Sequence, residues 1–169
     1  MVTMFKKLTV MPVLAAALLA SSWAYAAREV RTFEVFVTIP TLAFYVIPSD
    51  PGWVHLEQRL PWNLTTSTLG SLRKYFDVKN EAGSIEARLE GRPYLSNGTD
   101  AHDIGLRVLF NGVLLSELDN REVLPMSEAA LGKRVLLEVL PFPPVDGVYK
   151  PGNYFGSVNL IFNAVLPGA

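Results

Sequence analysis

The stretch "IGLRVLFNGVLLS", residues 104–116, carries apolar side chains at every second position from Ile104 to Phe110. Because successive side chains of a strand point to opposite faces, this spacing predicts a strand with one buried face. Asn111-Gly112 separates it from a second apolar run, and both of these residue types tolerate positive φ. The stretch therefore predicts a β-hairpin.

Similar strand patterns lie on both sides of this hairpin. The clearest is "SIEARLEG", in which Ile85, Ala87 and Leu89 alternate with charged residues. Further strands are predicted at 41–48, 54–60, 71–80, 134–140 and 153–163. The only helical turn expected is in "LPMSEAALGK", which Gly132 closes. Many short strands separated by turn residues indicate an all-β sandwich of one domain.

The first 26 residues have the three parts of a secretory signal peptide. Lys6 and Lys7 precede the uncharged run Leu8–Ala20, and "AYA" at 24–26 fits the small-x-small cleavage rule. The run is too short to span a membrane comfortably, because a spanning helix takes roughly 20 apolar residues. We therefore expect an exported chain that begins at Ala27; an uncleaved anchor helix is the alternative.

Composition excludes several classes of protein. Without residues 1–26 the chain keeps 13 basic and 16 acidic residues, a net charge of −3, which argues against nucleic-acid binding. Half of the residues are hydrophobic, so an ordered core is expected. The chain has no cysteine, which excludes disulfides, thiol catalysis and cysteine metal sites.

Residues suited to catalysis or metal binding are sparse. The two histidines are His55 and His102, and the second lies in "TDAHD" between Asp100 and Asp103. A catalytic zinc takes three protein ligands in fixed geometry, whereas a polar loop of this composition is also ordinary turn chemistry. No serine lies in a nucleophile elbow. We predict no enzyme activity, no cofactor and no metal site.

The two ends of the exported chain carry strong strand patterns. In "REVRTFEVFVTIP", residues 28–40, the apolar side chains of one face are Phe33, Val35, Val37 and Ile39. In the last predicted strand one face carries Tyr154, Gly156, Val158, Leu160 and Phe162. Glycine inside a strand often marks the close approach of another backbone. This combination fits a subunit that exchanges strands with a neighbour, although alternation alone also fits a first strand paired within its own sandwich.

The segment "KPGNYFGSVNLIF", residues 150–162, resembles the C-terminal signature of chaperone–usher pilins. With the absence of cysteine, "LSNG" before "IGLRVLFNGVLLS" and the alternating N-terminus, nearly the whole exported chain resembles the major subunits of class 5 (alpha-clade) fimbriae, of the colonisation-factor-antigen and cable-pilus type. The tryptophans and the proline-rich segment Pro141–Pro144 depart from that pattern.

The resemblance implies an incomplete immunoglobulin-like sandwich at residues 41–169 and an N-terminal donor strand at 27–40. A periplasmic chaperone would lend the missing strand, and at an outer-membrane usher the donor strand of the next identical subunit would replace it. The inserting side chains would be Phe33, Val35, Val37 and Ile39. The acceptor groove and chaperone contact would lie along Tyr154–Phe162. The implied product is an adhesive surface fimbria, with a tip adhesin subunit among the partners.

Two alternatives remain open from the sequence. One is a minor or tip fimbrial subunit that binds a host glycan, for which Trp53, Trp62, Tyr75 and Tyr94 are candidate stacking side chains. The other is a free-standing exported β-sandwich that binds a ligand or partner and does not polymerise.

Overall fold

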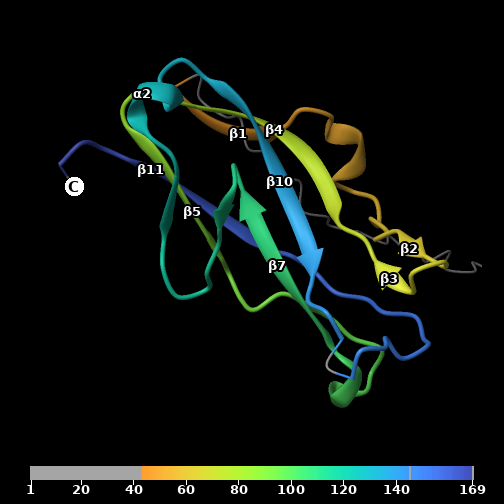
Figure 1. Cartoon of the computed structure of the whole chain (residues 1–169). Helices are drawn as coiled ribbons and strands as arrows, with labels where there is room; N and C mark the ends of the chain where they lie inside the picture. The colour runs from red at the N-terminus through yellow and green to blue at the C-terminus, as the bar shows by residue number, and fades with distance from the viewer. Residues whose placement is uncertain (1–42, 145, 169) are drawn as a thin grey trace, which may run out of the picture. The chain divides into compact units, whose positions relative to one another are not determined.

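The computed structural model describes residues 43–144 and 146–168, which form two antiparallel sheets and a small hairpin (Figure 1). The larger sheet has the order β1-β4-β10-β7-β6, with β8 paired to β7. Its strands are β1 (Phe44–Pro48), β4 (Leu72–Asn80), β6 (Tyr94–Leu95), β7 (Ile104–Phe110), β8 (Val113–Leu114) and β10 (Lys133–Pro141). The smaller sheet, in the order β11-β5-β9, contains β5 (Ser84–Leu89), β9 (Arg121–Leu124) and β11 (Leu160–Val165). The all-β prediction is confirmed.

Short elements connect the strands. They are the hairpin of β2 (Trp62–Asn63) and β3 (Thr68–Leu69), the 3-10 turns η1 (Pro51–Trp53) and η2 (Asp100–His102), and α2 (Met126–Ala129). The expected helical turn is therefore present, and Gly132 follows it with φ of 77°. Among the residues described, none of the helices is long and apolar enough to cross a membrane.

Alternate side chains of the long strands form the core. The alternating apolar residues of β4, β5, β7 and β10 are buried, except that Leu72 at the start of β4 is half-buried. The buried ones are Phe76, Val78, Ile85, Ala87, Leu89, Ile104, Leu106, Val108, Phe110, Val135, Leu137 and Val139. Lys74 interrupts the apolar face of β4, and its Nζ lies 5.0 Å from the ring centroid of Trp53. A cation–π contact thus accommodates the one charged residue on that face.

The predicted hairpin at Asn111-Gly112 joins β7 to β8. Asn111 has φ of 51° and Gly112 has φ of 78°, as the sequence predicted for this turn. The Asn111 side-chain amide also donates a hydrogen bond of 2.7 Å to the Val123 carbonyl oxygen. The asparagine therefore both permits the turn and ties it to β9 of the smaller sheet.

The strand predicted at residues 54–60 is wrong. Val54–Leu60 continues from η1 as turns and an irregular segment. The Gln58 side chain donates to the carbonyl oxygens of Trp53 (3.1 Å) and Leu56 (3.0 Å). Local side-chain hydrogen bonds thus satisfy backbone groups that a strand would have paired with a neighbour.

The last strand is shorter at its start and longer at its end than predicted, because β11 begins at Leu160. The chain first pairs with Ser96, beyond β6: the N–H and carbonyl groups of Phe155 and Ser96 exchange two hydrogen bonds of 2.8 and 2.9 Å. It then crosses to the smaller sheet. Tyr154 and Gly156 are therefore not part of β11, whereas Val158 packs against the core just before it.

Candidate functional site

Each sheet has an edge strand on each of the two sides of the sandwich, and the two sides differ. β8, at the β7 end of the larger sheet, lies against β9 at one edge of the smaller sheet. The strands at the other end of each order, β1 and β11, therefore share the opposite side (Figure 1). We call this side, bounded by Phe44–Pro48 and Leu160–Val165, the open side.

The outer edge of β11 offers backbone hydrogen-bonding groups. The Glu90 N–H donates to the Asn159 carbonyl oxygen (3.1 Å), so Asn159 is bonded toward the β5 side. In an antiparallel ladder the bonded residues alternate along each strand. The N–H and C=O groups of Leu160, Phe162 and Ala164 consequently point away from β5, and no partner strand pairs with them among the residues described.

The outer edge of β1 has the same character. The Ser49 N–H donates to the Tyr75 carbonyl oxygen (2.9 Å), which sets the alternation along this strand. The backbone groups of Phe44 and Val46 therefore point away from β4. Pro48 has no N–H to offer, as suits an edge position. Within the described part of the chain, β1 pairs only with β4.

The side chains of the open side are apolar and only half-buried. Phe44 and Val46 of β1, and Leu160 and Phe162 of β11, pack against the core without being enclosed by it. The ring of Phe162 lies 4.9 Å from that of Phe110, which in turn lies 5.5 Å from the ring of Phe76. The core thus continues to the open side without a covering layer from the residues described.

Charges are absent from both edge strands, whose sequences are "FYVIP" and "LIFNAV". Exposed edges of natural sheets are usually protected by charged side chains, prolines, bulges or a covering segment. Of these devices β1 has only its terminal proline. An uncharged pair of edges with half-buried apolar side chains is what an added strand requires, because such a strand gains both ladder hydrogen bonds and buried area.

Charged residues lie instead on the outward faces of other strands, among them β4 and β10. Arg134 forms a two-point ion pair with Asp77 (2.8 and 3.1 Å), and Arg73 pairs with Glu138 (2.8 Å). The hydrogen bonds from Arg134 hold the pKa of the Asp77 carboxyl below its ordinary value, and Asp77 raises the pKa of Arg134. This face is therefore a solvated surface, distinct from the open side.

The family model described as CS1 type fimbrial major subunit matches residues 29–163, which include β1 and the first four residues of β11. The chain belongs to the CS1 type fimbrial major subunit family. It is similar to the CooA pilin subunit from enterotoxigenic Escherichia coli, with a TM-score of 0.59 and 16% sequence identity over 72% of this chain and 86% of that one. No curated protein sequence matches it significantly.

The CS1 type membership establishes what the chain does at the coarse level. It is a structural pilin subunit with an immunoglobulin-like β-sandwich, and it assembles with other subunits into a surface fimbria. The family and the solved neighbour are both structural pilins, as the sequence resemblance predicted.

The structure places part of the predicted acceptor strand of this fimbrial subunit on the open side. Leu160 and Phe162 line it, and Val158 precedes it, and all three pack against the core. Tyr154 lies outside, where its hydroxyl donates to the Lys150 carbonyl oxygen (2.9 Å). A Cβ on Gly156 would lie 2.0 Å from the Tyr94 carbonyl oxygen, so this glycine admits a backbone of its own chain.

The donor residues Phe33, Val35, Val37 and Ile39 lie outside the described residues. Phe44 and Val46 were missed as site residues, although the charge-free run "TLAFYVIP" was the available signal.

The aromatic residues considered for glycan stacking do not gather on one surface of the fimbrial subunit. Trp53 packs edge-on against Phe76 at 5.9 Å, and Trp62 packs in the same way against Tyr149. Tyr75 lies on the outer face of β4, whereas Tyr94 lies on β6, and β10 and β7 separate these two strands.

Proposed function

We propose that the open side accepts a β-strand from another chain, and that this exchange links the subunits of the fimbria. In the filament the strand comes from residues 27–40 of the next copy. Its inserting face carries Phe33, Val35, Val37 and Ile39. The observation that supports the proposal most strongly is the pair of uncharged edges, β1 and β11, with their outward backbone groups and half-buried apolar side chains.

An inserted strand supplies stabilisation that offsets the cost of ordering it, which is about 10–20 kcal/mol for a tail of roughly ten residues. Burying four apolar side chains at about 1.5–3 kcal/mol each contributes roughly 6–12 kcal/mol before ordering costs. Each ladder hydrogen bond adds roughly 1 kcal/mol. Without a donor strand, the open side exposes apolar surface and free strand edges, which promote aggregation. The subunit consequently needs a substitute strand before it reaches the filament.

A periplasmic chaperone supplies that substitute strand in our proposal. Residues 1–26 direct export and are removed, and the chaperone then occupies the open side until an outer-membrane usher exchanges it for the next subunit. The signal-peptide pattern and the fimbrial family support this route. Expressed without a chaperone, the subunit is expected to aggregate, and co-expressed with its cognate chaperone it is expected to form a soluble complex.

Charge substitutions on the two faces of the donor strand test the proposal. Val35→Asp would place a carboxylate in an apolar site, which costs several kcal/mol or forces protonation. Its matched control, Glu34→Lys, changes a charge on the opposite face, where substitutions usually stay within about 0.5 kcal/mol. The measurements are filament yield in a shear extract and the periplasmic amount of chaperone-bound subunit.

We expect Val35→Asp to remove filaments and leave the chaperone complex intact, because the chaperone occupies the open side and not the donor strand. Glu34→Lys should assemble normally. Equal assembly of the two variants would show that this stretch is not a donor strand. A subunit that remains a stable monomer without any partner would favour the free-standing sandwich instead.

A further inference from the structure

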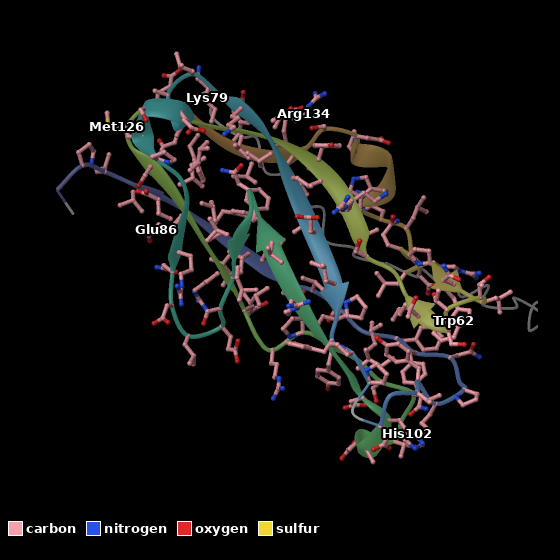
Figure 2. The ribbon with its side chains drawn as sticks, viewed as in Figure 1. Trp62, Lys79, Glu86, His102, Met126 and Arg134 are labelled. Carbon is pink, nitrogen blue, oxygen red and sulfur yellow. The ribbon has the colours of Figure 1, made fainter. Side chains whose placement is uncertain are left out.

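The long strands run between two ends of the sandwich, the α2 end and the proline-loop end. The α2 end contains the start of β1 at Phe44, together with α2 and Leu131. The proline-loop end contains Trp62 and the segment that follows β10. Figure 2 shows Met126 and Lys79 toward the first end, and Trp62 and His102 toward the second.

The direction of an inserted strand follows from the strand directions, given the strand exchange proposed above. β11 runs from the proline-loop end at Leu160 to the α2 end at Val165, which pairs with Ser84. A donor parallel to β11 would leave at the α2 end, where the acceptor's own β1 also begins. Three successive copies would then crowd around one end. A donor antiparallel to β11 leaves at the proline-loop end, which allows a linear polymer.

The connection between donor strand and sandwich is short. Five residue steps separate Ile39, the last inserting residue, from Phe44, the first residue of β1. Fully extended, they span about 17 Å, whereas a nine-residue strand such as β4 is about 30 Å long. The start of β1 in one copy must therefore lie close to the proline-loop end of the copy that holds its donor strand.

Exposed apolar side chains gather at that proline-loop end. Trp62 packs on Tyr149 with ring centroids 5.9 Å apart, and the Tyr149 hydroxyl donates to the Phe142 carbonyl oxygen at 2.8 Å. Phe142, Val148 and Tyr149 line a cavity of about 220 Å³ beside η2. Val148 is 62% exposed, and Trp62 and Phe142 are also exposed. We name Trp62, Phe142, Val148 and Tyr149 the proline-loop cluster.

The α2 end also carries exposed apolar side chains, which could pack against this cluster. Leu131 is 86% exposed and Met126 is exposed at the start of α2. They lie near the start of β1, since a Cβ on the adjoining Gly132 would be 3.6 Å from the Tyr45 hydroxyl oxygen. We propose that the α2 end of each subunit, through Leu131 and Met126, docks on the proline-loop cluster of the subunit that holds its donor strand.

The absence of cysteine makes this docking testable by cross-linking in filaments assembled by the full export pathway. Leu131→Cys combined with Val148→Cys is treated with a flexible bismaleimide and then boiled in detergent, which separates strands that are not covalently joined. A head-to-tail contact must give a ladder of covalent multimers. The control pair, Leu131→Cys with Tyr75→Cys, places the second cysteine on the outer face of β4 and should give no ladder.

The outcomes of the cross-linking separate the docking proposal from strand donation. Filaments of normal yield without a ladder from the first pair overturn the docking proposal but leave strand donation standing. Dimers from Leu131→Cys alone overturn it as well, because they show that two α2 ends meet. Where a cysteine variant fails to assemble, pairs of charged substitutions replace it. Val148→Lys with Leu131→Glu should still form filaments, because the two charges attract. Val148→Lys with Leu131→Lys should not form them. Equal yields of these two pairs overturn the proposal. Filaments that form without residues 27–40 overturn strand donation itself.

Discussion

Gly83 lies in the connection between β4 and β5, directly beside the end of β11. A Cβ at this position would lie 1.7 Å from the Val165 carbonyl oxygen and 2.7 Å from its carbonyl carbon. Non-bonded carbon atoms are about 3.5–4.0 Å apart at their optimum, so Gly83→Ala cannot be accommodated without movement of a backbone. The strand that must move is β11, whose other edge faces the open side.

The size of the effect follows from this overlap. Overpacking usually costs about 1–3 kcal/mol, and a clash between backbone segments belongs at the upper end because no rotamer can relieve it. For a domain near 150 residues, each kcal/mol lowers Tm by roughly 2–4 °C. We expect Gly83→Ala to lower Tm by about 6–12 °C.

Thermal unfolding of the monomer that carries a copy of residues 28–40 fused after Ala169 measures this shift. Gly91→Ala is the matched control, because a Cβ there meets no atom within 4 Å. Replacing glycine at a compatible position stabilises a protein by about 0.4–1 kcal/mol through the unfolded state. If the two variants unfold at the same temperature, the close approach of Gly83 to β11 does not exist in the protein.

Two further substitutions test the turn and the charged face. Asn111→Ala should lower the free energy of unfolding by about 2–3 kcal/mol, because it loses the hydrogen bond to Val123 and strains a positive φ. Asn111→Gly should lose only the hydrogen bond. Equal urea midpoints for the two variants would show that the positive φ contributes nothing to the loss. Asp77→Asn should destabilise slightly at neutral pH. Because the pKa of Asp77 is lowered in the folded state, its stabilisation is present above the ordinary carboxyl value of about 3.9 and is lost as pH falls through the lowered pKa. The gap between wild type and Asp77→Asn should therefore close in acid, and a gap that persists once the carboxyl is protonated would exclude this ion pair as its cause.

Local patterns predicted most of the core because they act within a few residues. The inward faces of β4, β5, β7 and β10 follow from simple alternation, and the β7–β8 turn follows from the backbone freedom of Asn111-Gly112. The failure at residues 54–60 is also local in origin. There the Gln58 side chain donates hydrogen bonds to nearby backbone carbonyls. The alternation of apolar and polar residues contains no information about such side-chain hydrogen bonds.

The candidate site depended on features that no short stretch encodes. Leu160 and Phe162 could be predicted, since their pattern is that of an ordinary half-buried strand. The start of β11 could not, because the pairing of Phe155 with Ser96 joins positions far apart in the chain. Phe44 and Val46 were missed because an edge position is a property of the sheet order.

The most direct test of strand acceptance at the open side is the melting temperature of the self-complemented subunit. A copy of residues 28–40, fused after Ala169 through a flexible linker in a subunit that lacks residues 27–41, should give a cooperative monomer. It should melt above the chaperone-bound subunit. The matched control carries Val35→Asp and Val37→Asp in the fused copy only, and it should gain no stability. A fused copy that leaves Tm unchanged, or one that stabilises equally with and without the two aspartates, would contradict the account.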